Sequence, residues 1–83
     1  MTGKGENRMG KELLEFSIRL DCLFLIHKKK KGAVAETLGC ARNTISNYIS
    51  ARKCPSVERF MEICNEVGAT DEEILHCLHA FKP

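Results

Sequence analysis

The chain has 83 residues, of which 43% are hydrophobic and 29% are charged. This length suits one small domain and excludes a two-domain enzyme with a cleft between its domains. No apolar stretch approaches the roughly 20 residues that a membrane helix needs, and residues 1–11 are too polar for a secretory signal. We therefore expect a soluble, cytoplasmic protein.

The net charge of +2 hides an uneven distribution along the chain. Residues 1–53 contain eleven Lys and Arg against five Asp and Glu, which gives +6, whereas residues 54–83 contain two against six, which gives −4. Such an asymmetry indicates that the front part meets an anionic partner, while the back part completes the core or contacts a protein.

Five cysteines, at positions 22, 40, 54, 64 and 77, include no C-x-x-C pair. The odd number and the spacing argue against a disulfide framework and against a zinc finger, and favour a reducing compartment. A cysteine on an apolar face acts there as a small hydrophobe, so Cys22 and Cys64 are predicted to be core residues. For Cys40, beside a turn near positive charge, a reactive thiol is conceivable, but core packing is the simpler interpretation.

Hydrophobic spacing predicts helices throughout and no strand. Residues 1–10, with three glycines and no aliphatic run, are predicted to be a flexible tail. A first helix at about 11–27 directs positions 13, 16, 20, 23, 24 and 27 toward the core. Leu14, Ile18 and Leu25 form a second apolar stripe on it, which is more hydrophobic surface than one core face needs.

Two short helices follow, at 33–38 and 42–49, joined by the turn 39–41. In the first, Val34, Ala35 and Leu38 are predicted to face inward, and Gly39 stands where a helix ends in the left-handed conformation. In the second, Ile45 and Tyr48 share the inward side. Its outward side is free of acids and carries amide, hydroxyl and guanidinium groups, on Arg42, Asn43, Ser46 and Asn47.

The last two helices have recognisable start signals. Ser56 is predicted to cap a helix that ends at Gly68 and buries Val57, Phe60, Met61, Cys64 and Val67. Thr70 and Glu73 form a capping box that opens a fifth helix, with Ile74, Leu75, Leu78 and Phe81 inward. Five helices with short loops predict one compact all-α domain over residues 11–83.

Two short helices joined by a three-residue turn have the geometry that places a helix in the DNA major groove. Residues 31–55 resemble the helix-turn-helix family of phage repressors and Cro proteins, the XRE-type regulators. The matching residues are Ala35, Leu38, Gly39, Thr44, Ile45, Ser46, Tyr48 and the Pro55-Ser56 pair. Together with the helix that ends at Gly68 and the helix after Thr70, the resemblance covers about two-thirds of the chain. It implies a five-helix, lambda-repressor-like DNA-binding domain with its motif at about 31–50.

The chain departs from the family pattern at three positions. Lys30 and Ala41 stand where the family usually has a small hydroxyl residue that caps a helix of the motif. Ala51 stands where it usually has a glycine, after the recognition helix. These departures affect caps and turns, and they leave the spacing of the inward residues intact.

The resemblance places the family's base-reading positions on Arg42, Asn43 and Asn47, with Ser46 beside them. Arg can form two hydrogen bonds with guanine, and Asn can do the same with adenine. Phosphate contacts, which set register, would come from Lys31, Thr44, Ser50, Arg52 and Lys53. The implied function is that of a sequence-specific, repressor-like transcription regulator of double-stranded DNA.

A homodimer on a palindromic operator is expected, because one recognition helix reads too few base pairs. Leu78 and Phe81 of the fifth helix are the preferred contact, and the stripe of Leu14, Ile18 and Leu25 is the second candidate.

Other classes of function are weaker interpretations. His76, Cys77 and His79 suggest a metal site, but no fourth ligand lies at a recognisable spacing, and histidines in the last turn of a helix are favoured by its dipole. Neither catalysis nor a cofactor is expected, because no phosphate loop and no nucleophile with a base is present. The main alternative is a protein-interaction module on the same fold, antitoxin-like or an anti-repressor partner, which would use the surplus apolar stripe.

Overall fold

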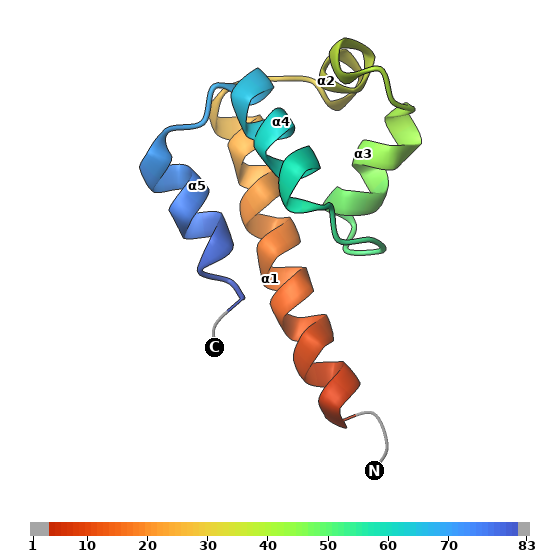
Figure 1. Ribbon diagram of the computed structural model, residues 1–83, viewed down its shortest axis with the longest axis vertical. Helices are drawn as coiled ribbons and strands as arrows, with labels where there is room; N and C mark the ends of the chain where they lie inside the picture. Colours follow the sequence, from red (N-terminus) through yellow and green to blue (C-terminus); the bar gives the residue numbers. More distant parts are fainter. Residues whose placement is uncertain (1–3, 82–83) are drawn as a thin grey trace.

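The structure, a computed structural model, describes residues 4–81, with side chains from residue 10 onward. This part of the chain forms five α-helices and no strand (Figure 1). They are α1 (Lys4–Ile26), α2 (Lys31–Leu38), α3 (Arg42–Ile49), α4 (Val57–Val67) and α5 (Asp71–Leu78). The prediction of a small all-α domain is therefore confirmed. Among the described helices, none is long and apolar enough to cross a membrane.

Helix α1 begins well before the residue that the sequence predicts. Residues 4–10 are helical where the composition predicts a tail, and residues 1–3 lie outside the described range. The segment has no proline, so its two glycines weaken the helix without ending it, and a helix already nucleated further along extends at low cost. The first turns of α1 project beyond the other helices (Figure 1).

The core is built around α1. Helices α3 and α5 pack against it on opposite sides, and α2 packs against α3 and α4 (Figure 1). The Phe16 ring of α1 lies between two others, with its centroid 5.2 Å from that of Phe60 and 5.0 Å from that of Phe81. The core also contains Leu20, Leu23, Phe24, Val34, Ala35, Ile45, Tyr48, Ile63, Cys64, Val67, Cys77 and Ala80.

Several positions that the spacing analysis assigns to the core are exposed, because the observed inward faces of these helices differ from the predicted ones. Cys22 is exposed, since it lies one turn from Ile18 on the outer side of α1. On α4, Val57 and Met61 are exposed while Ile63, which the spacing analysis missed, is fully buried. On α5, Leu75 and Leu78 are exposed, and the buried residues are Cys77 in the helix and Ala80 just after it.

The outer stripe of α1 is confirmed. Leu14, Ile18 and Leu25 are 53%, 51% and 69% exposed. His27, predicted to face the core, is half-buried, and its Nε2 lies 2.7 Å from Glu73 Oε1 at the start of α5. Arg19 holds the other end of α5 by donating to the carbonyl oxygen of His76 at 2.6 Å.

The predicted starts of α4 and α5 and the predicted end of α4 are confirmed, whereas α5 ends at Leu78, before the predicted inward Phe81. Ser56 Oγ accepts a hydrogen bond from the backbone N–H of Arg59, at 3.1 Å. Thr70 and Glu73 form both bonds of the capping box. Gly39 and Gly68 have φ angles of 73° and 89°, the left-handed conformation in which a side chain is strained.

Candidate nucleic-acid interface

Helix α3 is fixed on the core by two inward side chains and one buried hydrogen bond. Ile45 has no exposed surface, and Tyr48 is buried beside it, as the spacing predicts. Ser17 of α1 donates its hydroxyl to the backbone carbonyl of Tyr48, at 2.7 Å. A buried bond of this kind is costly to leave unmade, so it fixes the end of α3 against α1.

The opposite side of α3 faces outward. Arg42 and Asn43 are exposed, and Ser46 and Asn47 are half-buried, so the four predicted base contacts lie on one helix face. Between Glu36 and Glu58 the sequence contains no carboxylate side chain, and its charged residues are Arg42, Arg52 and Lys53. This face can donate hydrogen bonds to an anion without repelling it.

A hollow of about 470 Å³ adjoins the start of α3. It is lined by four cationic residues, Lys29, Lys30, Lys31 and Arg42, together with Phe24, Leu25, Gly32 and Ala33. The Arg42 side chain lies over Gly32, since a Cβ atom at position 32 would come 3.7 Å from its Cδ and Nε atoms. Four cations therefore surround the first turn of α2.

Lys31 has a partner inside the molecule. Its Nζ lies 3.3 Å from Asp21 Oδ1, a buried oxygen for which the described part of the chain supplies no well-angled hydrogen bond. Both side chains of the pair are about one-third exposed. The Lys31 side chain is therefore partly open to water, although its contact with Asp21 is covered, and it stands at the rim of the hollow.

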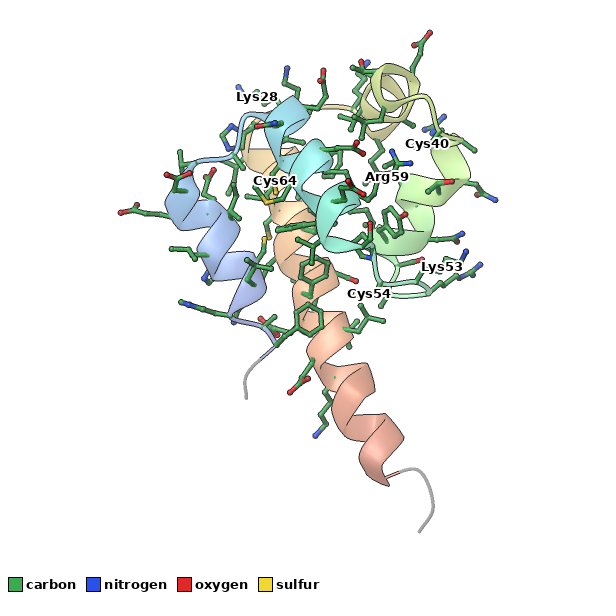
Figure 2. The ribbon with its side chains drawn as sticks, in the orientation of Figure 1. Lys28, Cys40, Lys53, Cys54, Arg59 and Cys64 are labelled. Carbon is green, nitrogen blue, oxygen red and sulfur yellow. The ribbon has the colours of Figure 1, made fainter. Side chains whose placement is uncertain are left out.

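The loop after α3 is bound to the end of that helix. The carbonyl oxygen of Asn47 accepts from the backbone N–H groups of Arg52 and Lys53, at 2.9 and 3.2 Å, and more weakly from the Ser50 hydroxyl at 3.4 Å. Ala51 has a φ of 64°, a left-handed conformation that glycine adopts without strain. Ser50, Arg52 and Lys53 are exposed, and Lys53 extends from the α3 side of the molecule (Figure 2).

The starts of α2 and α3 are open. Lys30 and Ala41 occupy the capping positions, and within the described chain neither helix receives a side-chain cap. Neither has an acidic residue in its first turn, and Thr44 in α3 is half-buried. Uncapped N–H groups carry partial positive charge, which favours an anion at these ends.

Sequence reasoning missed three residues that build this site, two surface lysines and one buried serine. Lys29 and Lys30 line the same hollow as Arg42, and the four-lysine run was the available signal. That signal was ambiguous because lysine runs often lie at a solvated corner. Ser17 was missed because a lone serine in an amphipathic helix gives no sign of a buried partner.

The histidines of α5 do not converge with the cysteine between them. Cys77 is fully buried in the core, whereas His76 and His79 are exposed. In the part of the chain that the structure describes, no three His, Cys, Asp or Glu side chains are grouped as metal ligands.

Comparison of the chain with protein-family models, with curated proteins and with solved structures finds no match.

Proposed function

We propose that this protein is a sequence-specific, DNA-binding transcription regulator that places α3 in the major groove. The observation that supports this most strongly is the outward face of α3, whose side chains are exposed or half-buried, which is free of carboxylates and which has cations at both ends. An α-helix fits the major groove, and a face of amide and guanidinium groups matches the hydrogen-bonding edges of the bases there.

The proposed contacts fall into two classes. Arg42, Asn43 and Asn47, with Ser46, read base edges, because Arg and Asn can each form paired bonds to one purine. Phosphates are bound on either side of this face, by Lys31, Thr44, Ser50, Arg52 and Lys53. The lysine hollow and the open start of α2 support a phosphate position beside Lys31.

The test is binding to random-sequence duplex DNA over a range of salt concentrations. Affinity should fall steeply as salt rises, because phosphate contacts release counterions. Lys53→Gln should weaken binding to all sequences and reduce the slope of log K against log salt by about one. Lys11→Gln is the matched control, since it removes the same charge from the exposed part of α1 that precedes the core, and it should leave both quantities unchanged.

A second candidate function is favoured by the outer stripe of α1, whose three apolar side chains are half-exposed or more. On this alternative the chain is a protein-interaction module, antitoxin-like or an anti-repressor partner. The acid-free face of α3 argues for DNA, because carboxylates there would have favoured a protein partner. Absence of any salt-sensitive binding to duplex DNA would favour the alternative.

A further inference from the structure

An apolar hollow of about 360 Å³ lies between α1 and α5, which packs on the opposite side of α1 from α3 (Figure 1). Its floor is the buried side chain of Leu23, and Cys22 and Ile26 stand beside it. Ile26 is 62% exposed, so the described structure leaves this apolar side chain largely uncovered. Sites that bind small molecules have volumes of about 300–1,000 Å³ and mostly apolar linings. This hollow has both properties.

Two cross-links between the helices bound the hollow. At one end Arg19 donates to the carbonyl oxygen of His76, at 2.6 Å. At the other end His27 Nε2 lies 2.7 Å from Glu73 Oε1. The hollow follows α1 from position 19 to position 26, which is about 10 Å of helix. It is therefore a short compartment between fixed ends, which fits a small molecule better than a helix of another protein.

The end of the hollow at the start of α5 is acidic. Glu72 and Glu73 both line it, and exposed Glu72 has no ion-pair partner in the described part of the chain. Both hydrogen bonds that the Glu73 carboxylate accepts in the described structure go to Oε1, so Oε2 can accept a bond from a ligand. The bond from the backbone of Thr70 lowers the pKa of Glu73, and this carboxylate is therefore ionised at neutral pH.

The opposite end of the hollow offers little to an anion. The Arg19 side chain is only 20% exposed, and its guanidinium pairs with Glu15 at 3.0 Å in addition to the carbonyl of His76. An anionic ligand would meet a neutralised guanidinium and two carboxylates. A cation with an apolar body would instead place its charge beside the carboxylates and its carbon atoms on the apolar floor, and both contacts are favourable.

We propose that the hollow between α1 and α5 binds a small amphiphilic amine, with its ammonium group at Glu72 and Glu73 and its apolar part on the floor of the hollow. The site is separate from the proposed DNA-binding surface, because it contains no residue of α2 or α3. It therefore stands or falls independently of the proposed function.

The first experiment titrates the protein with octylamine, which is a cation at neutral pH. Octanol and octanoate are the neutral and anionic compounds of the same chain length. Binding is followed by NMR through the methyl groups of Leu23 and Ile26. Octylamine should shift these signals, and the other two compounds should bind at least about threefold more weakly, because they lack the ion pair. Unmoved methyl signals, equal affinity for octanol, or tighter binding of octanoate would each overturn the proposal.

Removal of one carboxylate tests the acidic end. Glu72→Gln should weaken octylamine binding by about threefold and leave octanol binding unchanged, because only the amine loses a charge partner. Glu58→Gln is the matched control, since Glu58 is an exposed carboxylate in the first turn of α4, as Glu72 is in the first turn of α5. An equal loss of affinity in both variants would assign the effect to net charge and contradict the site.

A lysine inside the hollow tests the apolar part. Ile26→Lys supplies an ammonium group from the wall of the hollow itself and should abolish octylamine binding. Folding should persist, because Ile26 is exposed and is the last residue of α1, where a cation is favoured by the helix dipole. Leu25→Lys makes the same charge change at a position that is 69% exposed and outside this hollow, and it should leave binding intact. Loss of binding in Leu25→Lys as well would overturn the location.

The wild-type chain carries its own reporter, because Cys22 is exposed and lines the hollow. Cys54 is exposed elsewhere. Burial raises the pKa of Cys64 to about 12 and that of Cys77 to about 11, so these two thiols stay protonated at neutral pH. Octylamine should slow alkylation of Cys22 by N-ethylmaleimide, measured by mass spectrometry, and leave the rate at Cys54 unchanged.

Two results of the alkylation experiment would reject the site. Protection of both Cys22 and Cys54 would show that the amine covers any apolar surface. Slower alkylation of Cys22 at higher protein concentration, without the amine, would show that a second copy of the chain covers the hollow.

Discussion

Two pairs of helices pack around α1, α2–α3 and α4–α5, and the two pairs differ in how their helices begin. Helices α4 and α5 begin at the caps Ser56 and Thr70, and acidic side chains occupy their first turns. Helices α2 and α3 begin at Lys30 and Ala41, and neither receives a side-chain cap in the described structure. Both halves nevertheless pack around the same core.

The difference separates stability from binding. Each cap contributes about 1 kcal/mol to a helix that has one, so the α4–α5 half satisfies its own backbone. The α2–α3 half leaves its N–H groups to water or to a ligand, and it contains Ala51 in a left-handed conformation. We infer that these open ends are compatible with the fold because the core holds α3 through Ile45 and Tyr48, and that they leave its polar ends free to meet an anion.

The largest expected effect on stability comes from removing a helix cap where the chain has one and adding a cap where it has none. Thr70→Ala should lower the free energy of unfolding by about 1 kcal/mol, because it removes the acceptor for the backbone N–H of Glu73. Ala41→Ser should raise it by about 0.5–1 kcal/mol, since position 41 already has the extended backbone of a capping residue. Urea denaturation followed by circular dichroism measures both.

Thr70→Ser, which keeps the hydroxyl, is the control and should match the wild-type chain. If Ala41→Ser failed to stabilise the protein, the start of α3 would be satisfied in some other way, and the contrast between the two halves would be lost.

A smaller effect is expected at Ala51. The left-handed conformation costs an alanine about 1 kcal/mol or more, and glycine relieves this cost while adding conformational freedom to the unfolded chain. Ala51→Gly should therefore stabilise the protein by a few tenths of a kcal/mol, up to about 1 kcal/mol. Ala33→Gly makes the same chemical change at an exposed position inside α2 and should destabilise by about 1 kcal/mol. Thermal unfolding of the two variants should show shifts of opposite sign.

Much of the fold could be predicted from the sequence because its signals are local. Gly39, Gly68 and the capping box define helix ends by short-range chemistry. Helices α3 and α4 begin and end close to the predicted residues, and α5 begins at the predicted one. The exact inward face was harder to predict. Ile63 is buried in place of Met61, and Cys77 in place of Leu78. Met61 and Ile63 stand at opposite edges of the apolar stripe of α4, and Cys77 and Leu78 are adjacent, so the position of the partner helix decides which of each pair is covered.

The candidate site shows the same limit. The composition of the outward face of α3 was evident from Arg42, Asn43 and Asn47, since it depends on helical periodicity alone. The hydrogen bond from Ser17 to Tyr48 joins residues far apart in the sequence. The position of Arg42 over Gly32 joins residues at the starts of two successive helices. Only the packing of α1, α2 and α3 brings these groups together.

The smallest effect tests how the start of α5 is held. The backbone N–H of Thr70 donates to Glu73 Oε1, and this bond, with the contact to His27, lowers the pKa of the Glu73 carboxyl. Because folding favours the ionised form, its contribution to stability is present above the ordinary pKa of 4.5 and is lost as the pH falls through the lowered value. Glu73→Gln keeps an oxygen that can accept from Thr70 and removes the charge. The wild-type chain should therefore be more stable than Glu73→Gln at pH 7, and the two should converge in acid when urea unfolding is repeated from pH 7 to pH 2.

Glu72→Gln, one residue earlier and exposed, is the control for loss of a carboxylate near the helix dipole. An equal pH dependence in both variants would assign the effect to the dipole and not to the bonds that Glu73 makes with Thr70 and His27.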